Sequence, residues 1–430
     1  MPEQLIHIDA RKATVRIGMI VGLVLAIVWT TFTLRWYLGN TLAENVENLQ
    51  LLQTAESLSP KDPLTHWSLA QFTKQELPTN DLNYGIREYE AAVALSPHDY
   101  RLWMSLGIAL EQAGDDSRAE HALRTAVSLA PSYSYPHWYL GNALLRSNRF
   151  DEAFAELRVA GDSNGELRTQ LFILAWEVYG ANIDSLLTAV GATPQTRAEF
   201  ALYLLGRGRI DDGIRLWRAI DAKDKRLSRF TGDQIMVTLM QANRFHDALD
   251  VWNDLAPDDY YRGQIGAVLG GDFEGDLVSG SDTAFGWQVT SSTPLQIGID
   301  NSVGHDSRRS LRLNFHVRST LEEIQISQLI AVSPATDYVM DFYVKTSSLE
   351  TAMTPYIEIF DAANKTSLGS SEPAPNGDND WQHVVLPFKT GDKTEAIRMH
   401  VTRSRCPDNI PVCPIFGTVW YDDFSLKRRS

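Results

Sequence analysis

The two cysteines of this 430-residue chain lie close together, which limits the chemistry that they can do. Cys406 and Cys413 enclose the segment Pro-Asp-Asn-Ile-Pro-Val, and no further cysteine exists to complete a zinc site beside them. Two cysteines at this spacing in a proline-rich loop are typical of a small disulfide. Disulfides persist in oxidising compartments. The spacing therefore predicts a Cys406–Cys413 disulfide in a part of the chain that lies outside the cytoplasm.

Other residues with catalytic potential are numerous, but they form no recognisable catalytic pattern. The sequence contains no nucleophile elbow, zinc-protease helix, phosphate-binding loop or dinucleotide fingerprint. Two of its 54 acidic residues could form a glycosidase pair, but no motif places two of them across a cleft. The ten histidines are scattered and are interpreted as structural. We expect a protein without turnover of its own, with an unrecognised enzyme site as the alternative.

The charge balance also restricts the partners. The net charge is −15, and phosphate recognition needs a basic surface, so nucleic acid is not expected as a partner. The apolar content of 44% is ordinary for folded protein, and the length suggests two or three domains.

An apolar segment near the N-terminus predicts a membrane helix. Residues 17–34 carry no charge and are long enough to span the hydrocarbon core of a bilayer. Basic residues within 11–16 precede the segment, and Trp36 and Tyr37 follow it. Positive charge stays on the cytoplasmic side and aromatic rings favour the interface, so the chain after the segment is expected outside.

The resulting prediction is a cytoplasmic N-terminus at 1–16, a transmembrane helix at 17–37 and an extracytoplasmic remainder. A cleaved signal peptide is the alternative. The apolar run is long for a signal peptide, and Trp29, Phe32 and Trp36 crowd the place of a small-residue cleavage site. We therefore favour a single-pass anchor, with a bacterial inner membrane as the expected location.

The next region contains a helical repeat. The phrase Ala-x-x-Leu-Ser/Ala-Pro occurs at 55–60, 92–97 and 126–131, and each proline ends a helical pattern. Within 100–131, small residues stand where two helices would cross, and larger ones fill the seam. The pattern resembles the tetratricopeptide repeat family. It is carried by Trp103, Leu106, Gly107, Leu110, Ala119, Leu123, Ala126 and Pro131.

The resemblance implies an all-α solenoid over residues 40–261. We expect a leading helix at 41–58, three clear repeats, and two degenerate repeats around 208–213 and 242–248. Such repeats bind partner proteins in a groove lined by the first helix of each pair. The matching residues here are Trp67, Gln71, Lys74, Met104, Ile108, Glu111, Trp138, Asn142 and Leu145.

Two other interpretations of these residues remain open. Trp67 and Trp138 could pack only between repeats, because aromatic residues at helical spacing are often core residues. The solenoid could also serve only to hold two modules apart.

Residues 263–430 predict an all-β domain, because apolar and polar residues alternate between turn-rich gaps. Leu311, Leu313 and Phe315, for example, alternate with polar neighbours. Eight or nine short strands of this kind indicate an antiparallel sandwich. The fold class predicted for the whole chain is therefore multidomain, with a transmembrane helix, an all-α solenoid and an all-β jelly-roll sandwich.

The ends of the β domain show a more specific resemblance. Residues 271–275 read Gly-Asp-Phe-Glu-Gly, 285–287 read Phe-Gly-Trp, and 422–426 read Asp-Asp-Phe-Ser-Leu. The domain resembles the jelly-roll carbohydrate-binding modules of the galactose-binding-like type. The resemblance implies a structural calcium ion where the first and last strands meet. Its matching ligands are Asp272, Glu274, Asp422 and Asp423. The alternative is that these acids are solvated edge or turn residues.

Sugar binding needs exposed aromatic rings beside polar groups. Tyr343 and Tyr356 are the candidates by position, with Gln328, Lys345 and Glu358 as possible hydrogen-bonding neighbours. Half-buried strand packing is the alternative for all five.

Two functions fit these features. The first is a non-enzymatic periplasmic scaffold that binds another envelope protein through its repeats, in polysaccharide assembly or export. The alternative is a carbohydrate-binding receptor whose sandwich binds glycan directly.

Overall fold

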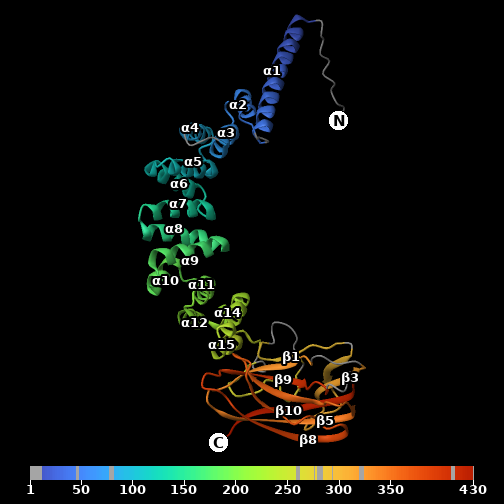
Figure 1. Cartoon of the computed structure of the whole chain (residues 1–430). Helices are drawn as coiled ribbons and strands as arrows, with labels where there is room; N and C mark the ends of the chain where they lie inside the picture. The colour runs from blue at the N-terminus through green and yellow to red at the C-terminus, as the bar shows by residue number, and fades with distance from the viewer. Residues whose placement is uncertain are drawn as a thin grey trace, which may run out of the picture. The chain divides into compact units, whose positions relative to one another are not determined.

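The computed structural model describes residues 12–44, 48–76, 82–257, 262–275, 277, 284–292, 294–318, 324–407 and 412–429 (Figure 1). The described chain is helical up to Leu255 and forms an antiparallel β-sandwich from Trp287 onward. The expected order of apolar helix, helical repeats and sandwich is confirmed. The chain divides into two compact units, Met1–Ala192 and Thr193–Ser430, so the sandwich shares a unit with the last helices.

The apolar segment lies in α1 (Ala13–Glu44), which is apolar enough over 18 residues and long enough to cross a membrane. Near its end, a Cβ at Gly39 would overlap the Ser59 hydroxyl, and the Arg35 guanidinium donates to the Ser57 carbonyl at 3.1 Å. The last turns of α1 are therefore packed against the following segment. A single apolar helix near the N-terminus suits an anchor or a signal sequence, so the membrane assignment stays a prediction.

The leading helix expected at 41–58 is in fact two helices. α1 ends at Glu44, and α2 (Leu49–Leu58) begins separately. The side chain of Asn48 accepts the Gln50 N–H at 2.8 Å and caps the new helix.

The three clear repeats form helix pairs. They are α3 (Pro63–Glu76) with α4 (Leu82–Leu95), α5 (Tyr100–Gln112) with α6 (Asp116–Leu129), and α7 (Ser134–Arg146) with α8 (Phe150–Ser163). A Cβ at Gly107 or Gly141 would come within 2.6 Å of a leucine Cγ in the second helix of its pair. Glycine at these two positions therefore lets the paired helices approach closely.

One contact recurs in all three pairs. The side chain six positions after each helix-ending proline contacts the carbonyl oxygen of that proline. The rings are those of His66, Trp103 and His137, at nitrogen–oxygen distances of 3.2, 2.8 and 3.0 Å. Both histidines also contact a glutamate of the second helix through Nδ1. These two histidines are therefore structural, as expected.

The first unit ends with α9 (Gly165–Tyr179) and α10 (Ile183–Val190). The second begins with α11 (Pro194–Gly206), α12 (Ile210–Arg218), α13 (Ala222–Leu227), α14 (Arg229–Gln241) and α15 (Phe245–Leu255). Four turns within helix pairs contain a residue with φ between 58° and 78°: Gly114, Asn148, Gly208 and Asn243. The shared turn agrees with the prediction of degenerate repeats around 208–213 and 242–248.

Among the described residues, the sandwich has two sheets of five strands each. Figure 1 shows the strands packed in layers. Sheet A has the order β1-β4-β9-β6-β7, and sheet B has the order β2-β3-β10-β5-β8. The strands are β1 (Trp287–Val289), β2 (Leu295–Asp300), β3 (Ser310–Val317), β4 (Ile326–Ala331), β5 (Asp337–Glu350), β6 (Pro355–Asp361), β7 (Ser367–Ser370), β8 (Gly377–Lys389), β9 (Ala396–Arg403) and β10 (Ile415–Arg428). Aliphatic and aromatic residues from alternate strand positions form the core between the sheets.

Hydrogen bonds attach α15 to the sandwich within the second unit. The His246 backbone N–H donates to Glu395 Oε2 at 3.2 Å, and His246 Nε2 lies 2.8 Å from the Val332 carbonyl oxygen. A carbonyl oxygen only accepts, so Nε2 carries the hydrogen. The last helices, α11 to α15, and the sandwich, which the sequence divides at 261–263, are therefore joined in one compact unit; residues 258–261 lie outside the described residues.

Candidate functional site

The five residues considered for sugar binding do not lie together. Gln328 is 0% exposed, and its side-chain amide donates to the Leu269 carbonyl at 2.8 Å. It follows Ile326 by two positions in β4, so it shares the core-facing side of the strand. Gln328 is therefore out of reach of a surface ligand, which corrects its proposed role.

The other four residues divide between the two outer faces of the sandwich. Tyr343 and Lys345 alternate with the buried Phe342 and Val344, so they lie on the outer face of sheet B. The Tyr343 ring stacks on His305 at a centroid distance of 3.5 Å. The Lys345 ammonium donates to Asp380 at 2.6 Å. Tyr343 is therefore already engaged by the turn after β2, and Lys345 by Asp380 of β8.

Tyr356 and Glu358 lie on the opposite side, on the outer face of sheet A. They alternate along β6 with Ile357 and Ile359, both of which are 0% exposed in the core. Glu358 accepts the Ser367 hydroxyl at 2.9 Å. The next outward position in the same strand is Phe360. It has the same phase as Tyr356 and Glu358 but is not among the sugar-binding residues predicted from the sequence.

Phe360 lines a hollow of about 570 Å³ on sheet A. We call this the sheet A hollow. It lies over β1, β4, β9 and β6 and the adjoining turns. Its lining residues are Gln288, Thr290, Gln325, Ile326, Ser327, Phe360, Asp361, Ala362, Lys365, Arg398 and His400. The volume falls in the range of small-molecule sites, and one aromatic ring stands among polar groups.

Strand register determines the arrangement of the hollow. Arg398 in β9 is the register partner of Phe360 in β6, and His400 is the partner of Ser327 in β4. Arg398 Nη1 donates to Gln288 Oε1 at 3.1 Å and to Ser327 Oγ at 3.4 Å. Burial holds the pKa of the Arg398 guanidinium below its usual value.

Two further groups of the hollow are held by the backbone. His400 Nε2 donates to the Ile324 carbonyl at 2.9 Å, which orients the ring. The Asp361 carboxylate accepts the Ala363 N–H at 2.8 Å and the Thr394 hydroxyl. Asp361 is therefore occupied in shaping the turn that follows β6.

The acids considered for calcium binding come from segments that do meet. The Phe424 N–H donates to the Gly271 carbonyl at 2.9 Å, next to Asp272 and Asp423. Asp423 lies in a bulge of β10 with a φ of 52°. Asp272 accepts the Glu274 N–H at 3.3 Å. The first and last parts of the domain are thus adjacent, as the resemblance implied.

Hydrogen-bond donors surround these acids. Asp422 is 1% exposed, and its carboxylate accepts the backbone N–H groups of His305 and Asp423, both at 2.8 Å. Burial raises the pKa of Asp422 to about 6, and these two hydrogen bonds oppose the rise. His305 Nδ1 lies 2.7 Å from Asp423 Oδ2, and the Arg309 guanidinium donates to the Glu274 carbonyl at 2.6 Å.

The arrangement does not fit a calcium ion. Calcium requires six to eight converging oxygen ligands. Among the described residues, the group of three or more side chains that converges within 4.8 Å at this edge is His305, Asp306 and Asp423, and it includes none of Asp272, Glu274 and Asp422. A histidine and an arginine occupy the surroundings of Glu274, Asp422 and Asp423. The calcium ion therefore stays a prediction from the resemblance.

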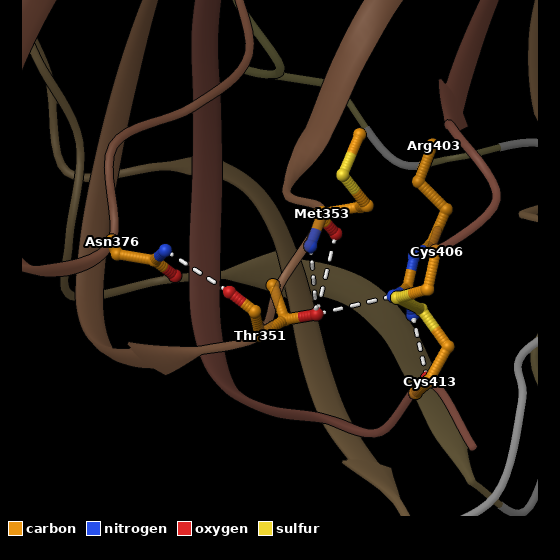
Figure 2. Close-up of a disulfide and its surroundings, with 6 residues drawn as sticks. All are labelled: Thr351, Met353, Asn376, Arg403, Cys406 and Cys413. Carbon is orange, nitrogen blue, oxygen red and sulfur yellow. Dashed lines mark hydrogen bonds between the residues drawn. A yellow bond between two sulfur atoms is a disulfide. The ribbon is translucent and has the colours of Figure 1, made fainter. Parts of the chain in front are cut away.

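The predicted disulfide is confirmed: Cys406 and Cys413 are bonded, with their Cα atoms 5.7 Å apart. Figure 2 shows Arg403 beside it, donating to the Cys413 carbonyl at 3.4 Å and to the Thr351 hydroxyl at 3.1 Å. The Asn376 side chain donates to the Thr351 carbonyl at 3.0 Å. Arg403 thereby connects the disulfide loop after β9 with the turn after β5.

The groove residues expected in the solenoid lie in α3, α5 and α7. Eight of the nine are half-buried, and we call these eight the first-helix face: Trp67, Gln71, Met104, Ile108, Glu111, Trp138, Asn142 and Leu145. The side chain of Lys74 lies outside the described residues. The Trp67 indole donates to Ser105 Oγ at 3.2 Å, and Glu111 pairs with Arg146. Both contacts join neighbouring repeats, while each residue keeps some exposed surface.

Comparison with protein families agrees with this architecture. A carbohydrate binding domain model matches residues 266–407, and a tetratricopeptide repeat model matches 80–134 and 117–165. The chain thus contains both modules that the sequence resemblance predicted. No curated protein sequence matches the chain.

Several solved structures are similar in fold. One described as "CBM4 structure and function" is 13% identical, with 38% of this chain and 99% of that chain covered, at a TM-score of 0.29. MamA from Desulfovibrio magneticus RS-1 is 16% identical, and the alignment covers 33% of this chain and 77% of MamA with a TM-score of 0.28. YrrB, described as a TPR protein with an unusual peptide-binding site, is 14% identical, and the alignment covers 49% of this chain and 95% of YrrB with a TM-score of 0.26.

The disulfide should contribute measurably to stability. Closing a loop of this size removes unfolded-state entropy worth about 2 to 3 kcal/mol. Replacing both cysteines by serine should lower the free energy of unfolding of the sandwich by about that amount, as measured by denaturant titration of the full chain in detergent. Wild-type protein treated with a reductant should show the same loss. Unchanged stability in both cases would contradict a role for the disulfide in holding the loop.

Proposed function

We propose that this protein is a membrane-anchored, extracytoplasmic adaptor without enzymatic activity. It binds a glycan in the sheet A hollow and a partner protein on the first-helix face. Its proposed location is the periplasmic side of a bacterial inner membrane. Its proposed task is to hold a polysaccharide near the envelope proteins that assemble or export it. The hollow is the observation that carries the glycan part of the proposal.

The chemistry of the hollow suits a sugar. The Phe360 ring offers a flat apolar surface for one face of a pyranose. Gln288, Gln325 and Ser327 offer amide and hydroxyl groups for the sugar hydroxyls around it. The hollow lies within the part of the chain that matches the carbohydrate binding domain model. We therefore propose Phe360 on sheet A, rather than Tyr343 on sheet B, as the aromatic residue on which the sugar stacks.

The proposed anchor is supported by α1 and by the disulfide. The last turns of α1 pack against Ser57 and Ser59. Cleavage within the apolar segment would leave these turns without the rest of their helix. A disulfide near the other end of the chain suits an oxidising compartment. The basic residues that precede the apolar segment favour a cytoplasmic N-terminus, which places the disulfide on the opposite side of the membrane.

The proposed protein partner is supported by the first-helix face. Ile108 and Leu145 on α5 and α7 are only half-buried, so the face presents apolar surface at its centre. The apolar centre favours an amphipathic partner segment over a bare terminal carboxylate.

Glycan binding can be tested with Phe360→Ala. Loss of the stacking surface should weaken binding of the preferred polysaccharide about tenfold. Affinity electrophoresis of the full chain in detergent, over a panel of bacterial and plant polysaccharides, measures the effect. Tyr343→Ala, on the outer face of sheet B, is the control and should bind as the wild type does. Equal losses in both variants, or a loss in Tyr343→Ala alone, would move the site away from the hollow.

Partner binding can be tested with Ile108→Glu. A charge at the centre of the first-helix face should weaken partner binding at least tenfold, because it would be buried in the interface without a counter-charge. The measurement is recovery of the partner with affinity-purified full chain from detergent-solubilised membranes. Val159→Glu, on the exposed surface of α8, is the matched control. A partner that is retained by Ile108→Glu but lost from Val159→Glu would place the interface on the second helices.

Membrane orientation can be tested by a fusion after Ser430. Alkaline phosphatase folds only where its disulfides form, so the fusion should be active in intact cells. A reporter that is active only in the cytoplasm should give no signal from the same position. An active cytoplasmic reporter together with inactive alkaline phosphatase would contradict the extracytoplasmic location and the proposed role in the envelope.

A further inference from the structure

Arg398 is a charged residue of the sheet A hollow, and its guanidinium is placed where it could bind a ligand. It lies between Ile397 and Met399, which are 0% and 1% exposed, so its side chain points out of the core on the side of Phe360. The guanidinium is half-buried by the walls of the hollow. Its position is fixed by the pairing of β9 with β4 and β6.

The guanidinium has no carboxylate partner. Within the part of the chain that the structure describes, the Arg398 guanidinium bonds to Gln288 and Ser327 and forms no ion pair with an Asp or Glu carboxylate, although the chain carries 54 acidic residues. Asp361, the acid that lines the hollow, is occupied by the Ala363 N–H and the Thr394 hydroxyl. Partial burial of an unpaired cation is costly. Stability alone does not account for an arginine here.

The neutral partners of Arg398 leave most of its donors available. Both of its hydrogen bonds come from Nη1, to Gln288 Oε1 and Ser327 Oγ. Nε and Nη2 donate to nothing among the described residues. These two nitrogens form the edge of the guanidinium that binds a carboxylate through two parallel hydrogen bonds. The neutral acceptors therefore hold the group in place and leave its bidentate edge unused.

The rest of the hollow has the same charge preference. Lys365 lines its rim, is exposed, and stands in the tight turn between β6 and β7 with a φ of 60°. His400 presents a second ring, oriented by its hydrogen bond to the Ile324 carbonyl. Among its lining residues the hollow has two cations, Arg398 and Lys365, and one carboxylate, the already occupied Asp361, in a chain of net charge −15. Such a local reversal of charge favours an anionic ligand.

We propose that the sheet A hollow selects acidic glycans, with Arg398 pairing to the carboxylate of a uronic acid residue whose ring lies on Phe360. The inference rests on the proposed glycan binding and names its substrate class. A carboxylate matches the planar fork of arginine, which a sugar hydroxyl does not. Lys365 adds a second, solvent-exposed attraction at the rim. The overall negative charge of the chain makes non-specific attraction of a polyanion an insufficient explanation for binding.

Pairs of polysaccharides that differ only in the carboxylate test the proposal. Polygalacturonate is compared with its methyl ester, and hyaluronan with its carboxyl-reduced form, by affinity electrophoresis of the full chain in detergent. The wild type should bind at least one acid form roughly tenfold or more tightly than its neutral counterpart, the difference expected for hydrogen bonds to a charged group. Dextran sulfate against dextran separates a carboxylate preference from attraction to any anion.

Substitutions then assign the preference to one residue. Arg398→Gln should bring the acid-to-neutral ratio close to one while the neutral forms still bind, and Arg398→Lys should retain part of the ratio. Arg312→Gln, which removes an arginine from the outer face of sheet B, is the matched control and should leave the ratio unchanged. Phe360→Ala should weaken acid and neutral forms alike, which separates ring stacking from charge recognition.

Three results would overturn the proposal in distinguishable ways. Equal affinity of the wild type for acid and neutral forms would remove the acidic preference and leave glycan binding intact. A preference for dextran sulfate that Arg398→Gln abolishes, without a carboxylate preference, would reassign the hollow to sulfated or phosphorylated glycans. No binding to any polysaccharide would remove the proposed function together with this inference.

Discussion

The pairing of β9 between β4 and β6 is the interaction on which the candidate site depends. It places Arg398 opposite Phe360 and His400 opposite Ser327, from strands that are far apart in the chain. The register of β9 is strongly specified, because a shift of one residue would turn Arg398 into the core and Ile397 to the surface. The buried isoleucines of β6 and β9 therefore determine where the polar groups of the hollow stand.

The solenoid follows a similar logic with different residues. A ring nitrogen from the start of each repeat binds the proline carbonyl that ends the preceding helix, and in two of the three pairs a glycine, Gly107 or Gly141, lets the two helices approach. Tryptophan replaces histidine at this position in the middle pair without loss of the contact. These contacts fix one repeat on the next and leave the first-helix face half-exposed. The packing interpretation and the binding interpretation of Trp67 are thus compatible, since its indole joins two repeats at the edge of the face.

The sequence predicted the architecture better than the site. Helical spacing of small and large residues identified the repeats, and strand alternation identified the sandwich. The same alternation could have excluded Gln328, which shares the phase of Ile326, and could have found Phe360, which shares the phase of Tyr356 and Glu358. It could not have revealed His305, which lies in an irregular turn after β2 and reaches Asp423 from 118 residues away. Nor could it show that donors surround the acids at the ends of the domain, because that depends on which loop lies over them.

The sequence by itself determined the class of each module, the disulfide and the presence of one apolar helix, because these follow from residue type and local spacing. The tertiary structure decided which side chains share a surface. Period-two alternation tells which residues point the same way along one strand, but not which strands are neighbours. Arg398, Phe360 and Gln288 form one hollow only because the order of sheet A is not the order of the chain. The unpaired guanidinium, from which the choice of an acidic ligand follows, becomes visible only when every nearby carboxylate has been placed.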